Sequence, residues 1–420
     1  MAETFLDQEE FEKKREKEYQ YVREVLDFGW HNTKSAGFVG RLEEKFAEVF
    51  AVKYAISNSS GTGTMHTCLA AAEIGPGDEV IVPALTMAST ALVVIHHNAV
   101  PVFADIDPET FEIDPDDVRR RITPYTKAII PVSLYGMAPD MDVIMEIARE
   151  HNLVVIEDDA QCFLGRYKGR LVGTIGDMAS FSFQGSKQMT SGGDGGMVIT
   201  DNEKYARLVR KASVLGYSTL GAKAGSTSIP REIRQDPNFE RHDLLGWNYR
   251  LPELSAAVGL AQLERLEELV GWRQDIAKMY AEVIDGCSWL VPQKTPGNIT
   301  HTYYIYAVLL KTEKKDLSWR TFRDKYVEFG GEPIYGALKP VHLEPVFREE
   351  KFYGKGCPNH CPLYQGTSQK YEKGLCPVCE KVQPNLFCFK THYKVRNDKT
   401  LAMRQMDALA ATIAYFAGTR

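Results

Sequence analysis

One lysine, Lys187, stands in the segment 180–196, where its amine could form a covalent bond with a carbonyl compound. It follows the short apolar run 178–183 and precedes a glycine cluster, a pattern typical of an irregular loop after a buried strand. An amine that is removed from water loses its proton more easily, and the free amine can condense with an aldehyde. The alternative is an ordinary solvated lysine, because most lysines in proteins are exposed. The residues upstream bear on this choice.

A run of acidic residues that includes Asp158 follows the apolar stretch 153–156. Because α/β proteins bind ligands at the carboxyl ends of parallel strands, Asp158 is a candidate ligand-binding group. There it could pair with the protonated pyridine nitrogen of pyridoxal phosphate and help the ring to accept electrons. Ala160, on the same side of the strand, would leave a flat surface for the ring. The alternative is that these acids cap the loop or form ordinary ion pairs.

Ser60, Gly61 and Thr62 lead from a short strand into the helical apolar pattern of residues 65–72. Small residues at a helix start leave backbone amides free to bind an anion, so these three residues are candidates to bind a phosphate. Ser182, shortly before Lys187, could offer its hydroxyl to the same group. Serine and threonine at helix starts are also ordinary caps, and this alternative stays open here.

Short apolar runs separated by helix-length stretches follow from residue 54 onward. The expected strands cover residues 79–83, 101–106, 127–134, 153–157, 178–183 and 196–200. This alternation is typical of an α/β domain with a large, mostly parallel sheet that helices flank on both faces. Two helices, over residues 8–28 and 41–50, are expected before this sheet.

A smaller C-terminal α+β domain is expected after the large one. Its expected elements are a long helix over 252–286 that leads out of the large domain, a strand over 302–310 and helices over 319–329 and 401–416. We therefore predict an N-terminal part of residues 1–265 and a C-terminal domain of residues 266–420. Residues 217–243, and a cysteine-rich insert at about 350–381, show no regular pattern.

The composition argues against several classes of protein. The formal net charge of −6 and a pI near 6.0 do not suit a general nucleic-acid binder. The first residues lack an apolar signal core and no apolar stretch is long enough to span a bilayer, so we expect a cytoplasmic protein that binds no membrane. The eight cysteines are expected to be reduced thiols, because no secretion signal accompanies them.

Five motifs follow one another in a specific order. They are Ser60-Gly61-Thr62, Gly77-Asp78 before the strand 79–83, Glu157-Asp158 with Ala160-Gln161, Lys187 before Gly195-Gly196, and Gly246-Trp247-Asn248-Tyr249-Arg250. In this order they closely resemble the DegT/StrS family of pyridoxal-phosphate-dependent sugar and cyclitol aminotransferases, which have the aspartate aminotransferase fold type I. The resemblance runs from about residue 37 to about residue 390, nearly the whole chain.

The resemblance implies a role for each matching residue. Lys187 would bind pyridoxal 5'-phosphate as an imine and carry the proton, while Asp158 would face the pyridine nitrogen and Gln161 the phenolic oxygen. The residues implied in phosphate binding are Gly61, Thr62 and Ser182, joined by Asn248 from the second subunit of a homodimer with shared active sites. Where the family often stacks an aromatic residue on the cofactor, this chain has Met87.

The implied activity is transfer of an amino group from glutamate or glutamine to a keto sugar, expected to be nucleotide-linked, or to a cyclitol ketone. Lys187 argues against those members of the family in which a histidine replaces the lysine and the reaction is a dehydration. Two alternatives stay open: a synthase of the aminohydroxybenzoate type, and a catalytically silent regulatory or interaction protein that kept the fold. His301 and His342 could line the acceptor pocket or be ordinary hydrogen-bonded histidines.

The insert carries two cysteine pairs, Cys357 with Cys361 and Cys376 with Cys379. Paired cysteines of this kind occur in zinc knuckles, and His360 could be a further ligand. The sequence Cys-Pro-Val at 376–378 also matches a family motif that binds no metal. We expect no metal site, and a structural zinc on the four cysteines is the alternative.

Overall fold

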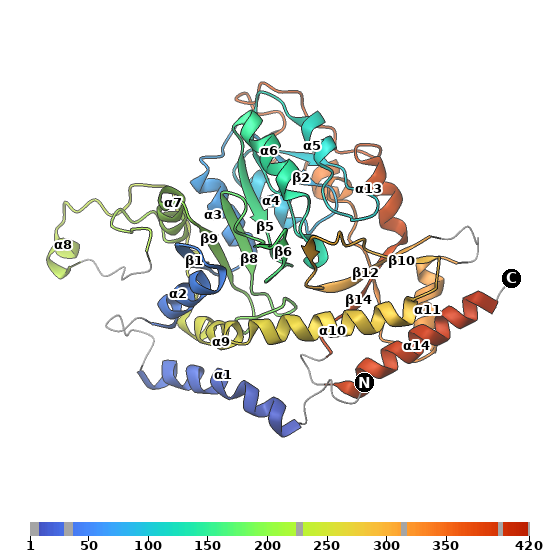
Figure 1. Cartoon of the computed structure of the whole chain (residues 1–420). Helices are drawn as coiled ribbons and strands as arrows, with labels where there is room; N and C mark the ends of the chain where they lie inside the picture. The colour runs from blue at the N-terminus through green and yellow to red at the C-terminus, as the bar shows by residue number, and fades with distance from the viewer. Residues whose placement is uncertain (1–7, 29–36, 224–229, 312–316, 394–397, 419–420) are drawn as a thin grey trace.

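A seven-stranded sheet forms the centre of the molecule (Figure 1). The computed structural model describes residues 8–28, 37–223, 230–311, 317–393 and 398–418. The strands lie in the order β1 (Tyr54–Asn58), β9 (Gly196–Thr200), β8 (Met178–Ser182), β5 (Val154–Asp158), β4 (Thr126–Ile129), β2 (Glu79–Pro83) and β3 (Val100–Ala104). From β8 to β3 all neighbours pair in parallel, whereas β9 is antiparallel to both β8 and β1. The predicted α/β class with a mostly parallel sheet is confirmed.

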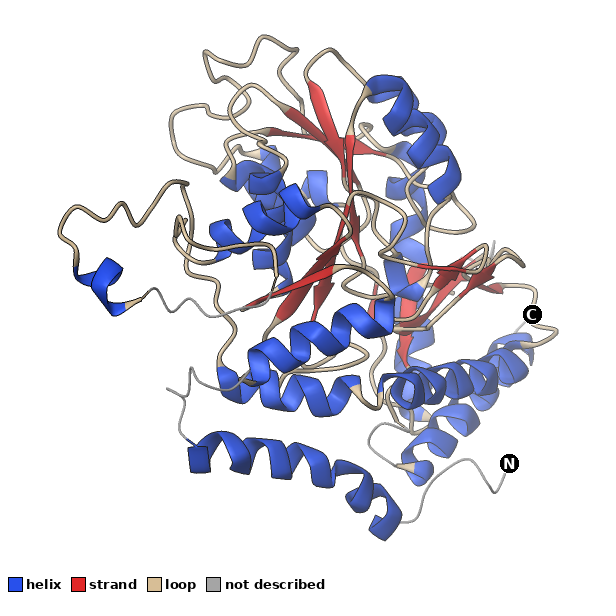
Figure 2. Cartoon of the chain, turned by 60° about the vertical axis from the view of Figure 1, so that its left-hand side comes forward, coloured by secondary structure: helices blue, strands red, loops and turns tan. Residues whose placement is uncertain are grey.

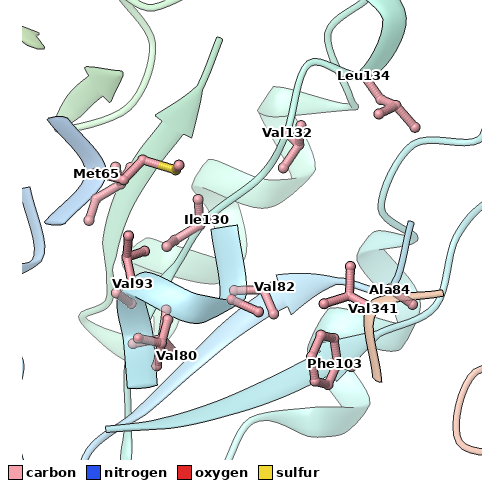
Figure 3. Packing of buried hydrophobic residues seen from close by; sticks show 14 of the residues in the cluster. Met65, Val80, Val82, Ala84, Val93, Phe103, Ile130, Val132, Leu134 and Val341 are labelled. Atoms are coloured by element: carbon pink, nitrogen blue, oxygen red, sulfur yellow. The ribbon is translucent and has the colours of Figure 1, made fainter. Parts of the chain in front are cut away.

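Alternate residues of each strand face opposite helix layers, as the pleat of a strand requires. Val80, Val82 and Phe103 belong to the hydrophobic cluster on one face. Figure 3 shows Val80 and Val82 in this cluster, with Val93 close to Val80. The helices that cover this face are α3 (Gly61–Ala71), α4 (Ser89–His96) and α7 (Glu203–Ser213).

The opposite face is covered by a second helix layer. Ile81 and Val155 pack there against α5 (Pro115–Arg121) and α6 (Met141–His151). Farther along this face, Phe181 and Ile199 pack against α2 (Phe38–Phe50) and α9 (Glu253–Leu263). Helix α1 (Gln8–Phe28) lies outside α9 (Figure 1). Figure 2 shows helices on both sides of the strands, so the sheet is buried on both faces.

A second sheet of four antiparallel strands follows in the C-terminal part. Its order is β10 (Leu290–Pro292), β12 (Ile305–Leu310), β14 (Leu386–Lys390) and β13 (Tyr335–Gly336). Helices α10 (Leu266–Ile284), α11 (Trp319–Glu328) and α14 (Lys399–Gly418) share one hydrophobic cluster with it. This is the smaller α+β region that the sequence predicts, while the division of the chain at residue 265 stays a prediction.

Other elements are short. They are β6 (Arg166–Tyr167), β7 (Arg170–Leu171) and β11 (Ile299–Thr300) of a three-stranded sheet, the helices α8 (Arg231–Gln235), α12 (Pro345–Arg348) and α13 (Pro377–Val382), and the 3-10 turns η1 (Leu134–Gly136), η2 (Val341–Leu343) and η3 (Gln383–Asn385). Within the ranges described, no helix combines the length and the apolar character that a membrane span needs.

Two predicted elements differ from the structure. The helix predicted over 252–286 is two helices, α9 and α10, because the backbone at Arg265 leaves the helical region (φ −115°, ψ 11°). The strand predicted over 302–310 begins only at Ile305, since Tyr303 has a positive φ of 46° that no strand accommodates. The hydrophobic periodicity of both segments continues across these backbone breaks, so the sequence pattern does not reveal them.

The two segments without a regular pattern have different structures. The segment after Tyr217 leaves the body of the molecule and carries α8, which lies far from the sheet in both views (Figures 1 and 2). Its base is held by the backbone hydrogen bond from Ser218 N to Arg241 O, 2.8 Å. The cysteine-rich insert instead lies along the edge strand β3, where the Tyr371 hydroxyl donates to Pro101 O at 3.1 Å. It therefore covers an edge that would otherwise be open to other strands.

Candidate active site

The register of the sheet brings the sequence-predicted residues to the carboxyl ends of neighbouring strands. Asn58, Gly196 and Ser182 are direct neighbours across β1, β9 and β8. On the other side of β8, Asp158 at the end of β5 is paired with Ser180. The start of α3, the loop with Lys187 and the acidic end of β5 therefore meet at the same end of adjacent strands.

Asp158 is buried, with only 3% of its surface exposed, and its carboxylate is held by two donors. Thr90 Oγ1 donates to Oδ2 at 2.9 Å, and Ala160 N donates to Oδ1 at 3.3 Å. Burial raises the pKa of Asp158, while these hydrogen bonds and the positive charge of Lys187 act to lower it. Asp158 and Lys187 thus interact electrostatically across the site.

Sequence reasoning missed Thr90, which fixes the orientation of the Asp158 carboxylate. Thr90 is fully buried, and its hydroxyl also lies 3.2 Å from that of Thr86. These two threonines are four residues apart, with Thr86 in the bend before α4 and Thr90 in the first turn of the helix. Such a polar pair at the start of an otherwise apolar helix was the available signal.

Glu157 and Asp159, the acids on either side of Asp158, have structural partners. The Glu157 carboxylate accepts three backbone N–H groups at 2.6–2.9 Å, from Gly173, Ile175 and Gly176. Asp159 Oδ1 accepts from the Ser133 hydroxyl at 2.6 Å, and burial raises the Asp159 pKa well above its ordinary value. The loop-capping alternative therefore applies to these two acids. Asp158 also accepts a loop amide, from Ala160 N, and its role toward a ligand stays a prediction.

The start of α3 combines a cap with free amides. Ser60 Oγ accepts from Gly63 N at 3.0 Å, so this hydroxyl caps the helix. The amides of Gly61 and Thr62 lie in the first turn, where no helical carbonyl is in reach. A Cβ on Gly61 would lie 2.6 Å from Ser182 Cβ, so only glycine allows this close approach. The structure thus brings Gly61, Thr62 and Ser182 together, with Ser60 as the capping residue.

Lys187 is half-buried and not fully solvated. Its Nζ lies 4.6 Å from the centre of the Tyr304 ring. The next residue, Gln188, is buried and donates through Nε2 to Gln161 O at 2.6 Å. The loop that carries the lysine is therefore attached to the loop that follows Asp158, which argues against the solvated alternative.

Gln161, Ala160 and Met87 are further residues that the sequence predicts to bind the cofactor. Gln161 Oε1 accepts from Tyr135 N at 2.8 Å, so its amide nitrogen is the group that it can offer to an oxygen of a ligand. Ala160 is half-buried at the end of β5. The Met87 side chain precedes α4 and is 52% exposed, which leaves it free to contact a ligand.

The segment 246–250 packs against the start of α3. Tyr249 O accepts from Ser59 N at 2.7 Å, and its hydroxyl lies 2.9 Å from His66 Nδ1. The side chain of Asn248 is exposed, and its Oδ1 accepts from Arg250 Nε at 3.0 Å. The phosphate role of Asn248 in a second subunit stays a prediction.

The two histidines considered for the acceptor pocket are both buried. His301 Nδ1 accepts from Tyr303 N at 2.9 Å and its Nε2 lies 3.0 Å from Gln293 Oε1, while burial lowers its pKa to about 3. His342 Nε2 lies 3.0 Å from Glu380 Oε1. These contacts favour the alternative of ordinary hydrogen-bonded histidines.

The four cysteines of the zinc alternative lie in two places. Cys357 and Cys361 pack beside Val100 at the surface of the insert, whereas Cys376 and Cys379 belong to the largest hydrophobic cluster. Among the residues that the structure describes, no three His, Cys, Asp or Glu side chains come together as a metal site. The zinc alternative therefore has no geometric support in that part of the chain.

Comparison with known proteins shows which family and which relatives this chain is similar to. The model of the DegT/DnrJ/EryC1/StrS aminotransferase family matches residues 12–369. The chain is 37% identical to GDP-perosamine synthase of Escherichia coli O157:H7 over 336 residues, which are 80% of this chain and 85% of that protein. It is 34% identical to L-glutamine:2-deoxy-scyllo-inosose aminotransferase of Streptomyces kanamyceticus over 310 residues, 73% of this chain and 70% of that one.

A solved structure is also similar over nearly the whole fold. It is S. venezuelae DesV in complex with a ketimine intermediate, with a TM-score of 0.78, 27% identity and coverage of 97% of this chain and 98% of that chain. This similarity includes both sheets of the described fold, since they lie within the matched length.

Proposed function

Because the chain belongs to the DegT/DnrJ/EryC1/StrS aminotransferase family, we propose that it uses pyridoxal 5'-phosphate to aminate a keto sugar or a cyclitol ketone. The amino donor in this proposal is glutamate or glutamine. The observation that carries the proposal is the meeting of three groups at one sheet edge: Lys187, the buried carboxylate of Asp158 and the free amides that start α3.

The residues at this edge fit such a cofactor. The amides of Gly61 and Thr62 and the hydroxyl of Ser182 can bind a phosphate, and the contact between Gly61 and Ser182 leaves no room for a larger residue there. Asp158 is buried and oriented by Thr90, as a partner of a pyridine nitrogen must be. When bound, the cofactor supplies an electron sink for the bond that breaks at the substrate carbon.

The side chains of this chain would perform the remaining steps. Lys187 Nζ would hold the cofactor covalently and, once an amino donor displaces it, would move a proton from the donor Cα. Asp158 would keep the proton on the pyridine nitrogen through its charge. Gln161 would donate its amide N–H to the phenolic oxygen, because its carbonyl oxygen is already bound to Tyr135 N.

The acceptor class follows from the relatives. A sequence relative is named as a synthase of GDP-perosamine, and another as an aminotransferase of 2-deoxy-scyllo-inosose. We infer that the acceptor of this chain is a polyhydroxylated ketone, and the first relative favours a nucleotide-linked sugar. A homodimer with shared sites also belongs to the proposal, and the exposed side chain of Asn248, which is free to reach a second subunit, supports it.

The proposal can be tested with the purified protein and pyridoxal 5'-phosphate. We expect a visible absorption band that glutamate or glutamine removes and that a nucleotide-linked keto sugar or a cyclitol ketone restores. Lys187→Ala should lack this band. A band and full turnover in Lys187→Ala would contradict the assignment of the lysine. A wild-type band that no donor changes would favour the catalytically silent alternative, and an aromatised product would favour the aminohydroxybenzoate-type synthase.

A further inference from the structure

Arg273 of α10 is a buried cation directly behind the loop that carries Lys187. Only 2% of its surface is exposed, and its guanidinium donates to four neutral oxygens. The acceptors are Lys187 O at 2.7 Å, Tyr304 O at 2.8 Å, Ser186 O at 3.0 Å and Thr391 Oγ1 at 3.2 Å. None of these acceptors is a carboxylate, so hydrogen bonds to neutral oxygens, together with the Tyr304 ring 5.8 Å from the guanidinium carbon, must offset the cost of burying the charge.

These hydrogen bonds join the Lys187 loop to the C-terminal sheet. Tyr304 immediately precedes β12 and Thr391 immediately follows β14, which is the neighbouring strand. Thr391 Oγ1 in turn donates to Tyr303 O at 2.7 Å, so the ends of the two strands are tied to each other. The backbone of Lys187 is therefore held in place by the smaller sheet and not only by β8.

The ring of Tyr304 lies under the side chain of the same lysine. Lys187 Nζ is 4.6 Å from the ring centre, and the Tyr304 hydroxyl is 2.9 Å from Ser186 Oγ. The face of an aromatic ring attracts a cation, most strongly where water is partly excluded. Tyr304 thus offers a defined position to the amine at the end of a long, flexible chain, and it would attract most strongly the ammonium group that forms once the amine has taken up the proton.

We propose that Arg273 and Tyr304 position Lys187 for catalysis, Arg273 through the loop backbone and Tyr304 through contact with the amine itself. The inference rests on the proposed function, in which the amine is released from the cofactor during each turnover. A free lysine side chain has several rotamers, and proton transfer requires it to stay within reach of the substrate carbon. The ring of Tyr304 and the anchored backbone restrict the amine to that region.

The test uses the half-reaction with the amino donor, followed by visible absorbance in the full-length, cofactor-loaded protein. Here kcat denotes the limiting rate constant of this half-reaction and KM the donor concentration that gives half of it. Tyr304→Leu removes the aromatic face, whereas Tyr304→Phe keeps the face and loses only the hydroxyl contact with Ser186. We expect Tyr304→Leu to lower kcat about 10- to 100-fold with KM within about twofold, since the amine acts on the bound donor. Tyr304→Phe should stay within about threefold of the wild-type kcat.

Arg273→Met tests the backbone anchor, and Arg265→Met is its matched control on the same helical segment. Arg265 pairs with Glu268 and lies over the ring of Trp272, away from the lysine loop. Both changes remove an arginine at α10 or its N-cap, but only Arg273→Met should lower kcat. Should Arg273→Met fail to fold, the half-exposed Tyr304 still allows the test.

Two measurements that do not depend on turnover accompany the kinetics. One is the visible circular dichroism per bound cofactor, which should fall in Tyr304→Leu and Arg273→Met because a loosely held chromophore has a less asymmetric environment. The other is borohydride reduction followed by peptide mapping, which adds hydride across the bond between cofactor and lysine and shows which lysine is modified. We expect less modification at Lys187 in both variants than in the wild type.

Failure of this inference and failure of the proposed function give different results. If borohydride modifies Lys187 in the wild type, and if Tyr304→Leu and Arg273→Met match the wild type in kcat and in dichroism, the positioning role is wrong. If Arg265→Met lowers kcat as much as Arg273→Met does, the decrease reflects a general disturbance of the helix, and the inference is also wrong. If borohydride does not modify Lys187 in the loaded wild-type protein, the proposed function itself fails.

Discussion

The acids Glu157, Asp158 and Asp159 have the same chemistry and three different environments. Glu157 accepts three backbone amides and Asp159 accepts a serine hydroxyl, whereas Asp158 accepts from Thr90 and Ala160 N and interacts electrostatically with Lys187. The difference comes from strand alternation and from which loops pack against each side chain. The function of each carboxylate is therefore set by its neighbours and not by its residue type.

Thr90→Val tests how much the orientation of Asp158 contributes to cofactor binding. The change keeps the shape of the side chain and removes the hydrogen bond to Oδ2. A hydrogen bond to a charged group contributes about 1.5–3 kcal/mol, so we expect pyridoxal 5'-phosphate to bind about 10- to 100-fold more weakly. Equilibrium dialysis measures this affinity. Thr90→Ser retains a hydroxyl and should recover most of the affinity. If Thr90→Val bound pyridoxal 5'-phosphate as tightly as the wild type, Thr90 would have no role in orienting Asp158 for the cofactor.

Asp159 makes the stability of the folded chain depend on pH in a defined direction. The pKa of Asp159 is raised in the folded state. Above the ordinary pKa of an aspartate, the unfolded chain has therefore lost this proton while the folded chain still holds it. The free energy of unfolding then falls as pH rises, by up to about 1.4 kcal/mol per pH unit, until pH passes the folded pKa.

Asp159→Asn should remove this dependence, because asparagine does not ionise and its Oδ1 can still accept from the Ser133 hydroxyl. Urea unfolding of the cofactor-free protein at several pH values measures the difference. We expect similar stability of the two proteins in acid and a growing advantage of the variant toward neutral pH. Parallel curves would show that Asp159 is ionised in the folded state.

Sequence reasoning predicted Lys187 and Asp158 because each lies in a short motif at the end of a strand. It did not predict Thr90, Arg273 or Tyr304, whose contacts with the site join residues that are 31 to 118 positions apart. Such contacts depend on how loops and helices pack, and apart from the threonine pair at positions 86 and 90 the sequence gives no sign of them. The ordinary character of His301 likewise became visible only through its two buried hydrogen bonds.

At the scale of elements, the proposed phosphate site depends on the close approach of α3 to β8. Gly61→Ala would bring a Cβ to 2.6 Å from Ser182 Cβ, so the helix start must move away from the strand. Overpacking of this kind costs about 1–3 kcal/mol, and we expect a comparable loss in the affinity for pyridoxal 5'-phosphate. Gly75→Ala is the control, because nothing lies within 4 Å of its added Cβ. Unchanged affinity in Gly61→Ala would mean that the phosphate binds elsewhere.

The cysteine-rich insert contributes to stability through the edge of the large sheet. The Tyr364 hydroxyl donates to the carboxylate of Glu79, a fully buried residue of β2. Tyr364→Phe should lower the free energy of unfolding by about 1–3 kcal/mol, since the buried acid loses a donor, and should leave kcat unchanged. Tyr353→Phe removes the hydrogen bond to Ile95 O from a more exposed residue of the same insert, so it should lower the free energy of unfolding by less. Equal stability of Tyr364→Phe and wild type in urea would refute this role.

Element type was easier to predict than element ends. The strands β2 and β9 begin and end where the apolar runs do, because turn residues flank them. The break between α9 and α10 was missed, since leucines continue through it with helical spacing. The three-stranded sheet of β6, β7 and β11 was missed too, because strands of two residues have no periodicity to detect.

At the scale of the whole molecule, the site depends on both parts of the chain. The large sheet supplies Asp158, Ser182 and the start of α3, and the smaller sheet fixes the loop of Lys187 through Arg273. In the proposed site, a motion between the two parts would therefore change the position of the Lys187 amine before it changed the residues proposed to bind the phosphate. The order of motifs along the chain predicted the first group of residues, whereas the contribution of the smaller sheet required the tertiary structure.

The proposed sharing of active sites between two subunits can be tested by complementation. Lys187→Ala lacks the amine, and Asn248→Ala lacks a side chain that would reach the phosphate of the partner subunit. If sites are shared, a mixed dimer has one site in which both residues are intact and one in which both are replaced. After unfolding and refolding of an equal mixture, about half of the dimers are mixed, so about one quarter of the wild-type activity should return. If Asn248 instead acted within its own chain, every site would lack one residue and the mixture would be no more active than its parents. Each variant refolded alone is the control, and gel filtration before and after mixing establishes that subunits have exchanged.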